Sequence, residues 1–238
     1  MPEFLPKALA LLPLLSAATL HADWSGAISL SNRYPWRGFV KDEGLVVHGA
    51  LDYESPGGWF AGAVLSTIDF GASRYADAGN GELALYAGRA WQLGADWRAD
   101  IQLDQYFYDD DLFGRSADYR EVRARWHFRD LLSLEFDLAP DAYDSGESML
   151  NCQLGARYPL GPALELSAGI GYFDAAGVLG SDTRHGYLGL GWYHRHGAVE
   201  LRYVMASRTD TRTRYRAEDY AGEYTLDDAL VLSLSLGF

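Results

Sequence analysis

The chain ends in the stretch Ala229-Leu230-Val231-Leu232-Ser233-Leu234-Ser235-Leu236-Gly237-Phe238, and its alternation decides the fold. The leucines and the final phenylalanine share one face, while small and polar residues share the other. A period of two residues is that of a β-strand, because successive side chains point to opposite faces. The same period recurs throughout residues 23–238, and a helical period hardly occurs. The sequence therefore predicts an all-β protein.

Residues 1–22 have the features of a secretory signal peptide. A short start with Lys7 precedes the apolar run 8–15, and small residues lead to Ala22. We expect cleavage after Ala22 or Ala18 and a mature domain over residues 23–238. No run of 18 apolar residues follows the leader, so the mature chain is expected to lack a transmembrane helix.

The composition excludes several classes of function. The chain has 20 Lys+Arg against 33 Asp+Glu and a formal charge of -13, which argues against nucleic acid as a partner. The lone Cys152 allows neither an intrachain disulfide nor a cysteine zinc site. The sequence suggests no cofactor, and His194 and His196 beside Arg195 are a weak metal signal that we interpret as a polar turn.

The connections between strands distinguish a membrane barrel from a soluble sandwich. We count twelve strands, and their links alternate strictly between long and short. The long links cover 33–44, 70–81, 109–118, 139–147, 174–184 and 207–225, and the short ones 54–58, 92–96, 129–131, 159–162 and 195–196. Outer-membrane barrels have short periplasmic turns and longer external loops. We therefore predict a transmembrane antiparallel up-and-down β-barrel of twelve strands with both termini in the periplasm.

Aromatic residues gather on the apolar face beside the short turns. Amphipathic rings prefer the membrane–water boundary, so this set predicts a periplasmic girdle. Its members are Trp24, Tyr53, Trp59, Trp91, Trp97, Phe128, Tyr158, Trp192 and Phe238. The alternation of its strand places Arg89 on the lipid-facing side. Either its side chain extends to the aromatic girdle at the membrane boundary, or a β-bulge shifts the alternation of this strand by one residue.

The opposite face carries the charges of the strands, as expected for a lumen. Nine acidic residues (Asp52, Glu82, Asp100, Asp104, Glu121, Glu135, Asp137, Glu165 and Glu200) face five arginines (Arg98, Arg123, Arg125, Arg157 and Arg202). The three-residue link 129–131 places Arg125 opposite Glu135 and Arg123 opposite Asp137. These pairs either brace the wall or form a charged constriction; we favour bracing.

The first strands also resemble a known family. Ser31-Asn32-Arg33-Tyr34-Pro35-Trp36-Arg37-Gly38 is followed by Val47-His48-Gly49-Ala50-Leu51-Asp52-Tyr53, Gly58-Trp59-Phe60-Ala61-Gly62 and Ser66-Thr67-Ile68-Asp69-Phe70. These residues resemble the N-terminal region of the TorF-like porins, although Arg33, Pro35, His48 and Thr67 depart from its pattern. The resemblance covers roughly a fifth of the chain. It implies a passive outer-membrane channel, with Tyr34, Trp36, Arg37, Gly38, Asp52, Tyr53, Asp69 and Phe70 as the matching motif residues.

The sequence thus favours a narrow pore for small solutes with weak cation preference at most. A plugged structural or adhesive barrel is the alternative, and a rim-sited enzyme is a further one. Ser31, Ser66 and Ser148 lie toward the loop ends, but no hydrolase motif surrounds them and His185 is the nearby histidine.

The expected partners are those of an outer-membrane barrel. They are membrane lipid, lipopolysaccharide, small solutes, and the assembly machinery that would bind the terminal Phe238. Asp109, Asp110 and Asp111 could hold a divalent cation, and the loop arginines Arg208, Arg212, Arg214 and Arg216 could contact lipopolysaccharide phosphates. In both cases we favour a solvated loop.

Overall fold

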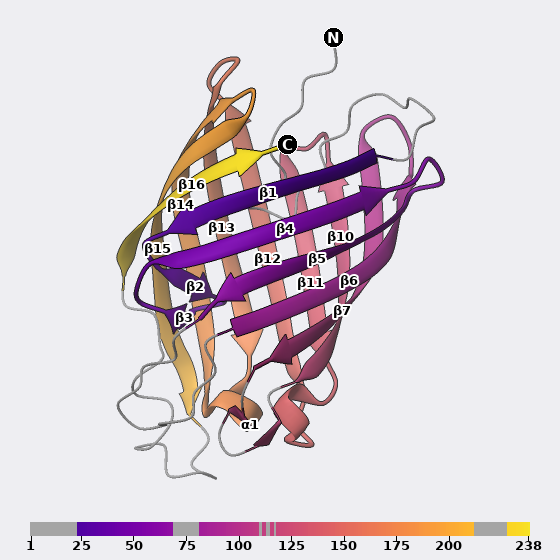
Figure 1. Ribbon diagram of the computed structural model, residues 1–238. Coiled ribbons are helices and arrows are strands. Elements are labelled where there is room, and N and C mark those ends of the chain that lie inside the picture. Colours follow the sequence, from indigo (N-terminus) through magenta and orange to yellow (C-terminus); the bar gives the residue numbers. More distant parts are fainter. Residues whose placement is uncertain (1–22, 69–80, 110, 113–114, 117, 212–227) are drawn as a thin grey trace.

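The computed structural model describes residues 23–68, 81–109, 111–112, 115–116, 118–211 and 228–238. Twelve strands close into an antiparallel barrel in which neighbours in the chain pair and the last strand pairs with the first (Figure 1). They are β1 (Asp23–Ser31), β4 (Val46–Glu54), β5 (Trp59–Thr67), β6 (Gly81–Gln92), β7 (Trp97–Tyr108), β10 (Tyr119–Phe128), β11 (Leu132–Ala139), β12 (Met149–Pro159), β13 (Leu164–Asp174), β14 (Ser181–His194), β15 (Gly197–Thr211) and β16 (Ala229–Gly237). The predicted barrel and its strand number are confirmed.

Shorter elements interrupt the long connections. These elements are β2 (Tyr34–Trp36), β3 (Phe39–Asp42), β8 (Asp111–Leu112), β9 (Arg115–Ser116), the 3-10 helix η1 (Ala142–Asp144) and the helix α1 (Ala176–Leu179). The start of β1 and the end of β16 lie at the end of the barrel with the short turns, as predicted (Figure 1). Within the described ranges, no helix is long and apolar enough to cross a membrane.

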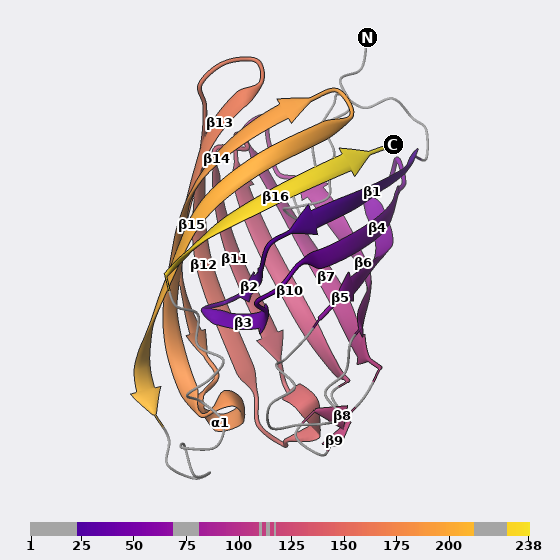
Figure 2. The same ribbon diagram turned by 60° about the vertical axis from the view of Figure 1, so that its left-hand side comes forward.

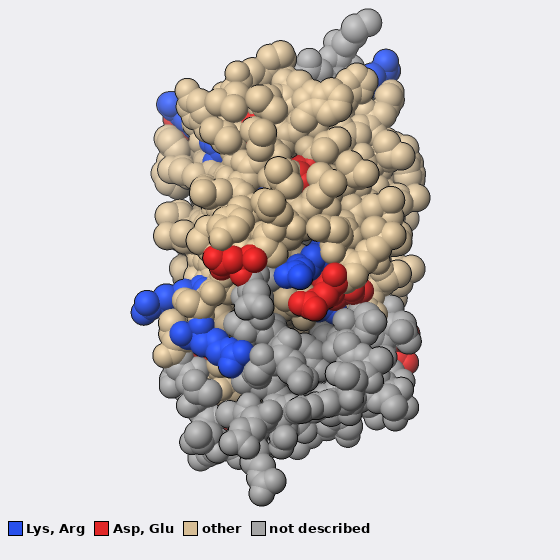
Figure 3. All heavy atoms as spheres, turned by 90° about the vertical axis from the view of Figure 1, so that its left-hand side faces the viewer, with Lys and Arg blue, Asp and Glu red and all other residues tan. Residues whose placement is uncertain are grey.

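The outer surface of the barrel is apolar. Leu103, Ile170 and Leu188 on three different strands are 53%, 68% and 59% exposed. Figure 3 shows a broad uncharged area, with charged residues gathered toward the end of the long connections. Such a continuous apolar band is costly in water and matches the lipid-facing surface of an outer-membrane barrel.

The predicted girdle residues lie on this outer face near the short turns. Seven of them are exposed, from Trp91 at 37% to Phe238 at 82%: Trp24, Trp59, Trp91, Trp97, Tyr158, Trp192 and Phe238. The rings of Tyr53 and Phe128 pack against neighbouring tryptophans, at centroid distances of 5.1 Å from Trp24 and 4.9 Å from Trp97. Phe238 also closes the barrel, because its backbone N–H and C=O both pair with Gly26 at 3.0 Å.

Arg89 points outward and lies among the girdle rings. Its guanidinium carbon is 5.1 Å from the centroid of Trp59 and 5.6 Å from that of Trp91. The register of β6 with β5 and β7 runs without interruption, so the alternative of a bulge in this strand is wrong. Stacking on two aromatic rings at the membrane boundary accommodates the charge instead.

The exposed leucines predict a depth-dependent cost for charge. Leu103→Arg, in the middle of β7, is expected to lower the free energy of unfolding in lipid vesicles by about 2–4 kcal/mol, because the guanidinium would lie among acyl chains. Leu93→Arg is the matched control, since Leu93 is 60% exposed in a short turn beyond the strands. Denaturant titrations of both variants measure the difference, and equal losses would contradict a lipid-facing β7.

Candidate functional site

A hairpin lies inside the barrel where the sequence suggested an external loop. The prediction that residues 33–44 form an outer loop is wrong, because β2 and β3 pair with each other within the ring of strands (Figure 2). All residues of β3, Phe39 to Asp42, are buried. Its apolar side chains are removed from water there, and its cations Arg37 and Lys41 pair with carboxylates of the wall, as buried charges require.

The turn of this hairpin explains the Arg37-Gly38 part of the sequence motif. Trp36 pairs with Phe39, so Arg37 and Gly38 form a two-residue turn, and their φ angles are 50° and 86°. Positive φ at both positions is typical of the type I′ turns that join tight hairpins. A side chain at Gly38 would also lie 2.7 Å from Thr183 Oγ1, which donates a hydrogen bond to the Arg37 carbonyl at 2.6 Å.

Arg37 fixes the tip of the hairpin to the wall. Its guanidinium donates two hydrogen bonds to Glu121 on β10, at 2.6 and 2.7 Å, and forms an ion pair with Asp137 on β11 at 2.9 Å. Burial lowers the pKa of Arg37, but Asp137 and Glu121 outweigh it and hold that pKa well above its usual range. Arg37 therefore remains a cation in the lumen.

Lys41 fixes the second strand of the hairpin at another point of the wall. Its ammonium group donates hydrogen bonds to Glu82 on β6 and, at 3.1 Å, to the hydroxyl of Tyr108 on β7. Burial lowers the pKa of Lys41, and the neighbouring Glu82 carboxylate acts in the opposite direction. Glu82 also accepts hydrogen bonds from Tyr108 at 2.6 Å and from Tyr34 at 3.0 Å.

Apolar contacts hold the hairpin against two other parts of the wall. Trp36 and Phe39 pack edge-on against Phe173 of β13, with centroids 5.2 and 6.1 Å apart. Val40 packs with Val204 of β15 and Val231 of β16. Since these strands lie opposite β6 and β7 in the strand order, the hairpin crosses the lumen.

The predicted ladder of lumen charges lies next to the hairpin. The register places Arg125 opposite Glu135 and Arg123 opposite Asp137, as the short link predicted. Arg123 donates to Asp137 at 2.5 Å, whereas Arg125 turns to Asp100 on β7 at 2.7 Å. The remaining members, Asp104 and Glu121, are buried on the same wall.

Two further polar contacts in this region could not be predicted from the sequence. Asn151 donates to Asp137 at 2.8 Å, and Gln102 to Asp104 at 2.6 Å.

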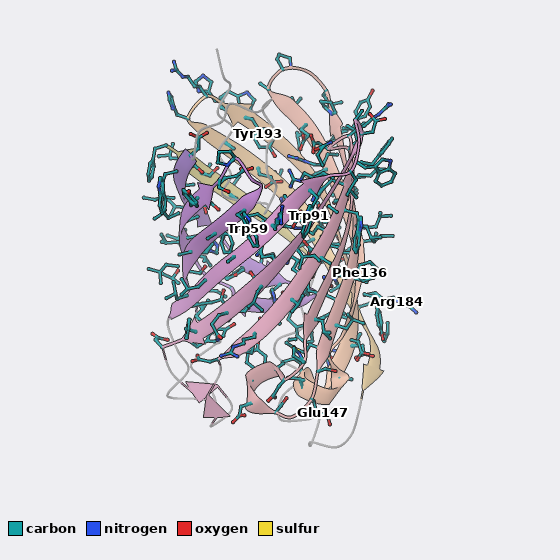
Figure 4. The ribbon with its side chains drawn as sticks, turned by 90° about the vertical axis from the view of Figure 1, so that its right-hand side faces the viewer. Trp59, Trp91, Phe136, Glu147, Arg184 and Tyr193 are labelled. Carbon is teal, nitrogen blue, oxygen red and sulfur yellow. The ribbon has the colours of Figure 1, made fainter. Side chains whose placement is uncertain are left out.

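Two other inward ion pairs contain more exposed arginines, whereas Arg98 is buried 3.6 Å from Asp100. Arg157 donates to Glu165 at 2.7 Å, and Arg202 to Glu200 at 2.8 Å. The arginine side chains are 24% and 25% exposed, whereas that of Arg123 is only 5% exposed. Near the short turns, the interior is therefore packed beside β7 and β10, where Arg98 and His127 are 5% and 4% exposed, and more accessible to water beside β12–β15. Tyr193 and Glu147, labelled in Figure 4, mark the two ends of the barrel beside this wall.

The remaining residues of the sequence motif and of the loops lie in different parts of the molecule. Asp52 accepts a hydrogen bond from Tyr86 inside the barrel, and Tyr53 belongs to the outer girdle. Asp69, Phe70, Asp110, Arg212, Arg214 and Arg216 lie outside the described residues. Arg208, His194 and His196 are exposed.

A serine–histidine contact that the sequence did not indicate occurs in the wall. His48 Nδ1 lies 2.8 Å from Ser66 Oγ, and the two residues are direct partners between β4 and β5. His185, the histidine expected near the serines, instead contacts Asn151 at 3.0 Å. Ser66 is 1% exposed and Tyr34 packs edge-on against His48, so this contact is part of the packing between the wall and the hairpin.

The closed barrel, its apolar exterior and its charged interior define the class as a porin-like outer-membrane β-barrel. The chain belongs to the family described as "Bacterial protein of unknown function (Gcw_chp)", whose sequence profile matches residues 16–238. A comparison with curated proteins finds no match.

Solved structures support the same fold. A KdgM porin superposes with a TM-score of 0.54 at 5% identity, covering 90% of this chain and 98% of its own. A KdgM porin in complex with disordered oligogalacturonate superposes with a TM-score of 0.51 at 6% identity, covering 91% and 96% of the two chains. At such identities the likeness concerns the fold.

Proposed function

We propose that the protein is a narrow outer-membrane channel for passive diffusion of small solutes, and that the β2–β3 hairpin sets its constriction. The observation that carries this proposal is the position of the hairpin, which spans a charge-lined lumen and contacts β6, β10, β11, β13 and β15. A loop folded into a barrel narrows the path and brings its own charges to it. The resemblance to the TorF-like porins supports the same function.

The balance of charge supports weak cation preference. The strands contribute nine acids and five arginines to the lumen, and the hairpin adds the cations Arg37 and Lys41 beside three of those acids, together with the buried acid Asp42. Most of the negative potential near the hairpin is therefore compensated by ion pairs. The water-accessible Arg157 and Arg202 are paired with Glu165 and Glu200 in the same way.

The location and partners follow from the proposed class. Residues 1–22 would direct export and be removed, and Phe238 would serve as the signal for the assembly machinery. The end with the short turns would face the periplasm, while the opposite end would lie near lipopolysaccharide. Arg184 points away from the barrel on that half and could reach a lipid phosphate (Figure 4).

Planar-bilayer recording of the refolded full mature chain tests the channel. We expect small single-channel steps and, in a potassium chloride gradient, a reversal potential slightly on the cation-selective side, because the paired charges leave a small excess of acids. Chloride permeating more readily than potassium would contradict the selectivity. A silent bilayer at all voltages, with the barrel correctly inserted, would favour the plugged structural barrel.

A further inference from the structure

A shallow apolar groove lies on the lipid-facing side of β4 and β5, beside the aromatic girdle. Its volume is about 330 Å³, and it is lined by Trp24, Leu51, Tyr53, Ala61, Gly62 and Ala63. Trp24 and Leu51 are 66% and 46% exposed, so the groove opens to the outside of the barrel. It exists because two successive outward residues of β5 are alanines, whereas larger side chains stand on β1 and β4. An empty groove would forfeit van der Waals contacts, so hydrocarbon chains fill it in a membrane.

Arg89 lies next to this groove on the same outer face. It is the direct partner of Trp59 between β5 and β6, and Ala61, the next outward residue of β5, lines the groove. Arg89 and Ala61 are therefore diagonal neighbours. The guanidinium stacks on Trp59 and Trp91, two tryptophans labelled in Figure 4. Because tryptophan rings of a girdle sit at the level of the lipid headgroups, the cation lies where phosphate groups are found.

The protein supplies no anion for Arg89 among its described residues. The Nε atom is shielded from water and has no hydrogen-bond partner there, and none of the described carboxylates pairs with the guanidinium. Arg129, at the same end of the barrel, shows the contrast. It also stacks on a girdle ring, Phe128 at 5.2 Å, but it donates hydrogen bonds to Asp96 at 2.9 and 3.2 Å. A guanidinium at the lipid surface without a carboxylate favours another anion, and phosphate oxygens match its planar set of donors.

We propose that Arg89 and the adjacent groove form a binding site for one glycerophospholipid of the leaflet beside the short turns. The guanidinium binds the phosphodiester, and an acyl chain lies along Ala61 and Ala63. A glycerophospholipid carries both the anion and the chain in one molecule, and it reaches the site by diffusion in the membrane. The site depends on the outer surface of the barrel alone, so it holds whether or not the lumen conducts.

Native mass spectrometry of the refolded mature chain, released from a neutral detergent, tests the site. The probe is dioctanoyl-phosphatidylglycerol, and dioctanoylglycerol is the same lipid without the phosphate. The wild type is expected to retain one phospholipid in preference to the uncharged lipid. Arg89→Met should bind the phospholipid roughly ten- to hundredfold more weakly, because a charge-assisted pair is lost. Methionine keeps an unbranched, lipid-compatible side chain. Arg129→Met is the matched control and should bind like the wild type.

Ala63→Phe tests the groove separately, since a phenylalanine on the lipid-facing side fills the groove without entering the lumen. It should weaken phospholipid binding roughly tenfold, because about two methylene groups lose their place.

Four outcomes overturn the site. They are equal binding by Arg89→Met and Arg129→Met, equal retention of the two lipids by the wild type, and inorganic phosphate that displaces the probe at equal concentration, which would indicate a site for a free anion. The fourth is Ala63→Phe that changes the oligomeric state but binds lipid like the wild type, which would assign the groove to a contact between copies. If Arg89→Met does not fold, the comparison of the two lipids on the wild type still decides.

Discussion

Replacing residues 33–44 by a linker of about four glycine and serine residues is expected to raise the single-channel conductance several-fold. The hairpin is the part of the described chain that crosses the lumen, with Lys41 fixed on one side and Val40 on the other. Ser31 and Val46 are direct partners between β1 and β4, so a short turn can join these strands without disturbing the wall. The barrel is therefore expected to persist while its interior opens.

The measurement is conductance in planar bilayers, with barrel formation checked by circular dichroism. A matched control replaces the turn 195–196 by glycine and serine, because that turn lies beyond β14 and β15 at the other end of the barrel. The control should conduct like the wild type. A hairpin-deleted barrel that folds but conducts no more than the wild type would show that the constriction lies elsewhere.

The wall could be predicted from the sequence because the membrane imposes a simple rule. Each strand must present apolar side chains to lipid and polar ones to the lumen, and a shift of one residue would reverse both faces. Leu230 to Phe238 show this rule with almost no exception. The same rule fixed the register of β10 and β11, since Arg123 and Asp137 had to lie on the inner face together.

The hairpin escaped prediction because its partners are distant in the chain. Arg37 binds Glu121, 84 residues away, and Lys41 binds Glu82, 41 residues away. In this segment Trp36, Phe39 and Val40 are mixed with charged residues without a regular period. Its hydrophobic pattern therefore cannot distinguish a hairpin inside the barrel from an external loop.

The charge count of the inner face contained one sign that further cations lie in the lumen. Nine acids against five arginines on the inner face left carboxylates without cations, and a barrel interior that is partly dry requires their neutralisation. The cations come from the hairpin. Arg37 in the turn sequence Arg-Gly supplies one, and Lys41 supplies the other.

Arg37→Met is expected to lower the free energy of unfolding by about 3–5 kcal/mol, because two carboxylates that stay buried, Glu121 and Asp137, are then left to share the single cation Arg123. Glu121 and Asp137 are each 1% exposed, and the Arg37 side chain itself is 8% exposed. Water cannot replace the lost ion pair at such burial. Equilibrium unfolding in lipid vesicles, followed by tryptophan fluorescence, measures the loss.

Arg33→Met provides the matched control on the same segment. Arg33 lies 3.7 Å from Glu43, whose side chain is 74% exposed, so this pair should contribute at most about 1 kcal/mol. The double variant Arg37→Met/Glu121→Gln should regain part of the stability that Arg37→Met loses, since Glu121 and Asp137 no longer share Arg123 as their cation. If Arg37→Met and Arg33→Met lower the free energy of unfolding by equally small amounts, Arg37 does not hold the hairpin against the wall. If Arg37→Met alone is costly and also makes the channel more cation-selective, the same guanidinium fixes the constriction and offsets its acids.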